Sequence, residues 1–178
     1  NRLGIACLTL LSLIYGRSPL PAEVFGDFTY ESLPGGVSIV DYPEVATGDV
    51  EIPKEIDGKR VTSIGAFAFA DCRWLSSVTM PESVTSIGEM AFHRCIHLEN
   101  VHISSNVTTI GRGAFGVCIA LLPFELPQGV TEIKERTFSD CDHFIDVTIP
   151  GSVLSIGPEA FFRCEELKSV SIPESVTS

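Results

Sequence analysis

From Val61 onward, apolar side chains return to the same positions every 23 residues. A valine opens each unit, a phenylalanine follows eight positions later, and a cysteine follows eleven positions later. The shared pattern reads V-T-x-I-G-x-x-A-F-x-x-C-x-x-L-x-x-V-x-I-P-x-S. The copies occupy residues 61–83, 84–106, 107–129, 130–152 and 153–175, and a sixth begins at Val176. A fixed period in the twenties predicts a solenoid.

Two kinds of element are expected in each unit. Ala91, Phe92, Cys95 and Leu98 share one face of a helix, so the first half predicts a short helix. Gly88 precedes it and allows a tight turn, although another copy has a lysine there. The V-x-I segment alternates like a strand, and a following proline closes it in most copies. Stacked units then give an α/β solenoid with a parallel sheet on one side and short helices on the other.

Residues 23–60 do not follow the repeat. Phe28 and Tyr30 alternate with polar residues, and the turn sequence Pro34-Gly35-Gly36 leads into a second apolar stretch. This pattern predicts a β-hairpin. We therefore expect residues 23–60 to form an N-terminal β cap over the first repeat.

Residues 1–22 predict a targeting segment. Arg2 precedes an uncharged apolar stretch, residues 3–15, which is shorter than the roughly 20 residues of a membrane-spanning helix. Its length fits the apolar core of a secretory signal peptide; an uncleaved membrane-targeting anchor and a buried helix are the alternatives. The chain begins with Asn and stops three residues into the sixth repeat, so we expect a truncated start and a fragment of a longer protein.

The repeat signature resembles the BspA-type leucine-rich repeat, also called the treponemal type. Val50-Glu51-Ile52-Pro53 is similar to that family's lead-in to its first repeat. The resemblance implies a surface protein, and some members act as adhesins for host proteins or other cells. Several copies depart from the pattern, which puts local packing in question; they have Ser104 for Pro, Phe124 for Val, Thr137 for Ala and Phe144 for Leu.

The charge balance of the chain excludes some classes of binding partner. Twelve Lys and Arg against 23 Asp and Glu give a net charge of −11, which argues against nucleic acids and anionic lipid surfaces. We expect no membrane insertion beyond the N-terminal segment.

Candidate chemistry is sparse. His93 and His97 have the spacing of a metal-binding pair on a helix, but no third ligand joins them, so two exposed histidines are favoured. The five repeat cysteines lie on the apolar stripe and are expected as reduced, packed thiols; disulfides and a catalytic thiol are the alternatives. No catalytic motif is present, and we expect no enzyme activity, metal or cofactor.

The variable strand positions are the candidate binding surface. They differ between copies while the framework stays fixed, as expected of a surface that binds a protein partner. Solvated strand residues without a partner are the alternative. The candidate partner-binding residues are Ser77, Thr79, Asn100, His102, Glu125, Asp146, Thr148, Ser169 and Ser171. We predict a non-catalytic binding module of a secreted or cell-surface protein, and the family resemblance implies an adhesin. A structural spacer array that carries another domain is the second hypothesis.

Overall fold

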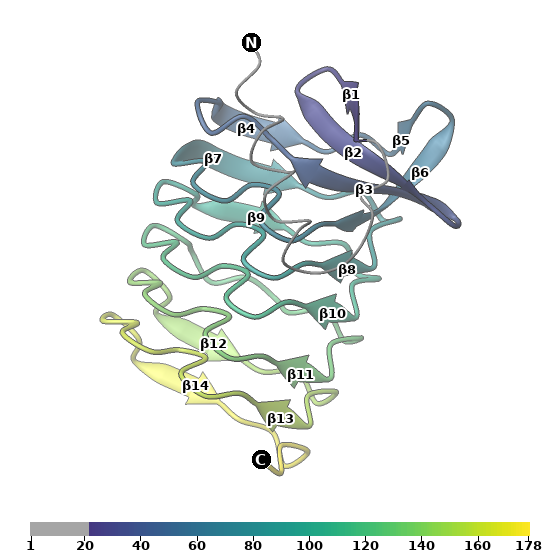
Figure 1. Ribbon diagram of the computed structural model, residues 1–178. Helices are drawn as coiled ribbons and strands as arrows, with labels where there is room; N and C mark the ends of the chain where they lie inside the picture. Colours follow the sequence, from purple (N-terminus) through teal and green to yellow (C-terminus); the bar gives the residue numbers. More distant parts are fainter. Residues whose placement is uncertain (1–21) are drawn as a thin grey trace.

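The computed structural model describes residues 22–178, which form a β-solenoid of stacked repeats beneath an N-terminal hairpin (Figure 1). Each repeat except the third supplies two short strands joined by turns, and the third supplies only the first strand. The first strands of the repeats are β6 (Lys59–Ile64), β8 (Ser86–Ile87), β10 (Thr109–Ile110), β11 (Glu132–Ile133) and β13 (Ser155–Ile156). A second row comprises β4 (Thr47–Glu51), β7 (Trp74–Thr79), β9 (Asn100–His102), β12 (Asp146–Thr148) and β14 (Ser169–Ser171).

The strands stack in parallel with the 23-residue register that the sequence predicts. Ser77 pairs with Asn100 and Val78 with Val101, so equivalent side chains lie above one another. The second row forms the sheets β4-β7-β9 and β12-β14, and the first row forms β6-β8-β10 and β11-β13. The expected parallel sheet is confirmed. We call the solvent-exposed side of the second row the strand face.

The expected short helices are wrong, because the segments between the two strands of each repeat are turns throughout residues 22–178. Two residues per repeat, four positions apart, adopt positive φ, as Met90 (51°) and Arg94 (64°) do in the second repeat. An α-helix requires φ near −60°, so each of these residues interrupts it. We call the outer side of these turn segments the turn face.

Hydrogen bonds between repeats replace those that a helix would form. The amides of Phe67, Phe69 and Asp71 donate to carbonyls of the next repeat, those of Glu89, Ala91 and His93, at 2.8–2.9 Å. Backbone donors that are buried in a fold need an acceptor, and here the neighbouring turn supplies it. The apolar spacing that suggested a helix face therefore belongs to a stack of turns.

A column of phenylalanine rings forms the centre of the core. They are Phe69, Phe92, Phe115, Phe138 and Phe161, with successive ring centroids 5.0, 5.4, 5.7 and 5.6 Å apart. Two departures from the repeat pattern join this column: Phe124 packs against Phe115, and Phe144 stacks on Phe138 at 5.2 Å. Stacked aromatic pairs stabilise beyond their buried area, so the column couples each repeat to the next.

The repeat glycine has a packing role rather than the turn role expected from sequence. A Cβ atom on Gly88 would lie 2.4 Å from the Ala66 nitrogen and 2.5 Å from the Gly65 carbonyl carbon. Gly111 has the same relation to Gly88, and neither has positive φ. Glycine is therefore needed because successive backbones touch at this position.

The expected hairpin consists of β2 (Phe28–Leu33) and β3 (Gly36–Asp41), flanked by β1 (Glu23–Phe25). Strand β3 pairs in parallel with β6, so the hairpin covers the first repeat (Figure 1). A further short strand, β5 (Glu55–Ile56), pairs with the start of β6. The aromatic column continues into this region, since Tyr42 lies between the rings of Phe69 and Phe28.

The targeting segment predicted for residues 1–22 lies, apart from Ala22, outside the described residues. Within residues 22–178, no helix has the length and apolar character to cross a membrane. The boundary between cap and repeats at residue 60 stays a prediction.

Candidate functional site

The predicted binding residues line two parallel columns on the strand face. One column contains Ser77, Asn100, Asp146 and Ser169, and the other contains Thr79, His102, Glu125, Thr148 and Ser171. All are exposed except Ser77, which is half-buried and donates a hydrogen bond to Asp49 Oδ1 at 2.7 Å. The stacking thus brings residues 23 positions apart onto one continuous surface.

Two acidic residues extend these columns and were not predicted. Asp49 pairs with Ser77 and Glu51 pairs with Thr79, and both are exposed. They lie before the first repeat, but the similarity of Val50-Glu51-Ile52-Pro53 to a strand end could have identified them. With Glu125 and Asp146, they give the two columns four carboxylates, whereas no Lys or Arg occupies either column between residues 49 and 171. The strand face is acidic.

The second row of strands is interrupted in the third repeat. Residues 121–127 contain no strand, and β9 and β12 belong to separate sheets. Pro123 occupies the position held by Asn100 in β9 and Asp146 in β12. Because proline has no N–H group, it cannot contribute its bond to the ladder, and the sheet stops there.

The first row of strands is interrupted between the third and fourth repeats, next to the segment that lacks a second strand. The amides of Gly88, Gly111 and Gly157 donate to the preceding repeat at 2.7–2.9 Å. Lys134 occupies this position in the fourth repeat, and among residues 22–178 its amide makes no such bond. A Cβ has no room where backbones touch, so β10 and β11 remain unpaired.

The turn segments stay joined across this junction. Gly113 donates to the Glu135 carbonyl at 3.0 Å, and Phe115 donates to the Thr137 carbonyl at 2.9 Å. The Phe115–Phe138 ring contact is also retained. Repeats 3 and 4 are therefore connected along the turns and the core but unpaired along both rows of strands.

A pocket of about 410 Å³ opens at this break. It is lined by Pro123, Phe124, Glu125, Leu126, Gln128, Asp146, Thr148 and Pro150. Three of these residues, Glu125, Asp146 and Thr148, were predicted from sequence as binding residues. The pocket combines two carboxylates with an amide, a hydroxyl and stiff apolar walls. We call it the groove.

The two histidines expected at the surface occupy different environments. His93 is half-buried rather than exposed, and burial lowers its pKa. His97 is exposed and stacks on the Trp74 ring with centroids 5.0 Å apart. Among the described residues, no group of three or more His, Cys, Asp and Glu side chains could hold a metal ion.

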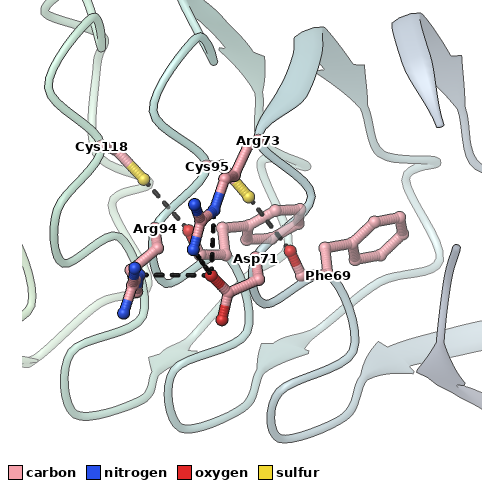
Figure 2. Close-up of polar contacts among 7 residues, drawn as sticks. Phe69, Asp71, Arg73, Arg94, Cys95 and Cys118 are labelled. Carbon is pink, nitrogen blue, oxygen red and sulfur yellow. Dashed lines mark hydrogen bonds and ion pairs between the residues drawn. The ribbon is translucent and has the colours of Figure 1, made fainter. Parts of the chain in front are cut away.

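Arginines on the turn face are paired with acidic residues. Asp71 accepts from Arg73 at 2.8 Å and lies 3.2 Å from Arg94 of the next repeat (Figure 2). Ion pairs of the same kind join repeats further along the stack: Arg112 with Glu135, Arg136 with Glu159 and Arg163 with Asp140. The carboxylates in the columns of the strand face form no ion pair within residues 22–178.

The repeat cysteines are packed in the core, where each thiol donates to a backbone carbonyl. Cys95 Sγ lies 3.1 Å from the Phe69 oxygen, and Cys118 makes the same contact with Phe92 (Figure 2). Burial raises the pKa of all five thiols, that of Cys72 to about 12. Raised values oppose thiolate formation and hence nucleophilic chemistry. The reduced state stays a prediction.

Comparison with known proteins identifies the repeats. The model of the BspA type leucine rich repeat region, with six copies, matches residues 59–178. Leucine-rich repeats of this kind are generally non-catalytic. No curated protein matches the chain.

Solved structures show the same fold. A T. pallidum leucine rich repeat protein is 33% identical with a TM-score of 0.80, and the match covers 86% of this chain and 72% of that one. A leucine rich cell surface protein from Faecalibacterium prausnitzii is 32% identical with a TM-score of 0.77; the match covers 84% of this chain and 39% of that one. The pneumococcal vaccine antigen PcpA, at 18% identity and a TM-score of 0.62, shares the fold; coverage is 87% and 50%.

Proposed function

Because the chain belongs to the BspA-type leucine-rich repeat family, we propose that its strand face binds a protein partner. The chain would then be the binding module of a secreted or cell-surface protein. Leucine-rich repeat modules generally serve protein interaction. The similarity to a Faecalibacterium prausnitzii cell surface protein supports the location.

One observation carries the proposal: the strand face presents exposed polar side chains from every repeat that forms a second strand. These side chains differ from copy to copy, while the valine, phenylalanine and cysteine beneath them repeat. The turn face, in contrast, uses its arginines in ion pairs between repeats. A partner that contacts several repeats at once would gain affinity from a row of hydrogen bonds, each worth roughly 0.5–1.5 kcal/mol.

The proposal is tested with two matched double variants. His102→Ala with Asp146→Ala removes one imidazole and one carboxylate from the strand face. His143→Ala with Glu89→Ala removes the same two groups from the turn segments, and all four side chains are exposed. The wild type is first screened against purified secreted and cell-surface proteins, and each variant is then titrated with any protein that binds.

The strand-face variant should weaken binding by roughly tenfold to a hundredfold, the equivalent of about 1–3 kcal/mol. The turn-segment variant should bind like the wild type, and both should unfold at the wild-type temperature. Loss of binding only in the turn-segment variant would assign recognition to the opposite side. If both variants bind like the wild type, recognition does not depend on these strand-face residues.

A further inference from the structure

We propose that the groove between repeats 3 and 4 docks an extended segment of a protein partner through a lysine or arginine side chain. This inference rests on the proposed function, since it names the place on the strand face and the kind of partner. It is an interaction surface that arises from a defect in the stack, and three features of that defect support it.

The first feature is the break itself. Elsewhere on this side the backbone continues from repeat to repeat: Met80 N donates to the His102 carbonyl at 3.0 Å, and Ile149 N donates to the Ser171 carbonyl at 3.1 Å. The equivalent amides on either side of the interrupted segment belong to Ile103, at the boundary of repeats 2 and 3, and Leu126, at the boundary of repeats 3 and 4. Within residues 22–178 neither donates to a backbone carbonyl. Strand edges without partners accept an added extended chain, whose own N–H and C=O groups complete the bonding.

The second feature is the shape and lining of the groove. Its volume of about 410 Å³ falls within the range of roughly 300–1,000 Å³ typical of ligand pockets. Pro123 and Pro150 provide rigid apolar walls. The aliphatic stem of a long basic side chain packs well against such walls while its charged end stays near polar groups.

The third feature is charge. Glu125 and Asp146 are the only ionisable residues in the lining, and both are exposed carboxylates. Asp146 Oδ1 accepts a hydrogen bond from Ser169 Oγ at 2.5 Å, which holds this carboxylate in place. Asp49 and Glu51 add negative charge along the same columns. A cationic side chain is the complementary occupant, and an acidic one would be repelled.

Two departures from the repeat pattern, at separate positions, accompany this groove. Pro123 lies in the interrupted second strand, and Lys134 replaces the glycine that lets neighbouring first strands approach. Pro123→Ser with Lys134→Gly restores the residue types of the other repeats, so it should close the stack. It leaves both carboxylates in place, which separates the contribution of the break from that of charge.

The probe is a fluorescein-labelled peptide, Thr-Val-Lys-Val-Thr with blocked ends, and its counterpart has Glu in place of Lys. Fluorescence anisotropy is measured at about 150 mM salt, where exposed charges more than about 8 Å apart are screened. The Lys peptide should bind saturably, and the Glu peptide should bind at least tenfold more weakly.

Glu125→Gln with Asp146→Asn should weaken binding of the Lys peptide at least tenfold. The matched control is Glu165→Gln with Glu166→Gln, which removes two exposed carboxylates outside the groove and should change binding less than twofold. The restored variant, Pro123→Ser with Lys134→Gly, should lose binding at least tenfold while its unfolding temperature stays equal or rises.

Several results would overturn the inference: no saturable binding of the Lys peptide, equal binding of the Glu peptide, or unchanged binding by the Glu125 and Asp146 variant. Unchanged binding by the restored variant would likewise reject the break as the cause. A further outcome is a protein partner that binds the Glu125→Gln, Asp146→Asn variant like the wild type but fails to bind His102→Ala. That result would support recognition by the strand face and exclude the groove as the binding site. Failure of the groove proposal can therefore be distinguished from failure of the proposed function.

Discussion

Replacing one repeat glycine with alanine should destabilise the whole stack. In Gly88→Ala, the new Cβ would lie 2.4 Å from the Ala66 nitrogen and 2.5 Å from the Gly65 carbonyl carbon. Both atoms belong to the backbone, so no side chain can rotate away. Relief requires the second repeat to move from the first by about 1 Å, because ordinary carbon contacts begin near 3.5 Å.

That movement would stretch the hydrogen bonds that join the two repeats. Gly88 N to Ile64 O is 2.8 Å and Thr85 N to Thr62 O is 2.9 Å, and each contributes roughly 0.5–1.5 kcal/mol. Overpacking adds about 1–3 kcal/mol. We therefore expect Gly88→Ala to lower the free energy of unfolding by about 2–6 kcal/mol.

The measurement is denaturant unfolding followed by circular dichroism. The matched control is Gly151→Ala, because a Cβ at Gly151 meets nothing within 4 Å and the residue does not have positive φ. Its effect should be neutral or stabilising by up to about 1 kcal/mol. Equal stability of the two variants would refute the reasoning that glycine is present for close approach of the backbones.

Four further predictions concern the core and the contacts between repeats. The five repeat thiols should be unreactive toward a thiol reagent when folded and all titratable in denaturant without reductant; recovery of three or fewer would indicate disulfides. Burial raises the thiol pKa above the unfolded value of 9.0, to about 12 for Cys72. The free energy of unfolding should therefore be constant below about pH 9 and fall as the pH rises toward the thiol pKa of the folded protein. The fall should reach up to about 1.4 kcal/mol per pH unit for one thiol. Equilibrium unfolding at pH 7.5 and 10.5 should show a smaller loss of stability in Cys118→Ala than in the wild type. An equal loss in both proteins would exclude thiol ionisation as the cause. Phe115→Ala should lower the free energy of unfolding by about 3–5 kcal/mol, since the Phe115 ring is buried between two others. Phe162→Ala is the control and should lower it far less, because the Phe162 side chain is 50% exposed. Similar unfolding temperatures of the two variants would contradict a stabilising role of the aromatic column. Ser83→Ala should lower the free energy of unfolding by roughly 0.5–1.5 kcal/mol, because the Ser83 hydroxyl donates to the Val61 carbonyl at 2.7 Å. An unchanged unfolding temperature would contradict a contribution from this hydrogen bond.

The repeat register and the parallel sheets were predictable because they follow from spacing alone. A 23-residue period places equivalent valines and phenylalanines above one another whatever the local backbone does. The hairpin was predictable from alternation and from the turn sequence at Pro34-Gly35-Gly36.

The turns were not predictable from the residues that adopt them. Positive φ usually points to glycine or asparagine, but here Phe67, Met90 and Val117 adopt it. Their backbone is held by bonds to the next repeat, such as Phe67 N to the Glu89 carbonyl at 2.9 Å. A contact between repeats decided the local conformation, and apolar spacing within one repeat could not reveal it.

The binding columns were partly predictable. The variable strand positions identified the exposed residues, including Glu125 and Asp146, although no property of the sequence located a pocket between them. Lys134 is the lysine that replaces the repeat glycine in the sequence pattern, whereas Pro123 was not among the expected departures. Only the structure shows that the interrupted second strand and the unpaired first strands occur in neighbouring repeats, because the two residues belong to different rows of the stack.

The most direct test of strand-face recognition is hydrogen exchange measured on the free protein and on its complex with a protein partner found by the screen. Backbone amides in residues 100–103, 122–126 and 146–149 should gain protection, with the largest gain at 122–126. The first and last of these segments contain β9 and β12, and the middle one lies in the interrupted segment. Amides in the turn segment 88–97 should exchange at the same rate in both states. Protection confined to the turn segments, with no change on the strand face, would contradict the account.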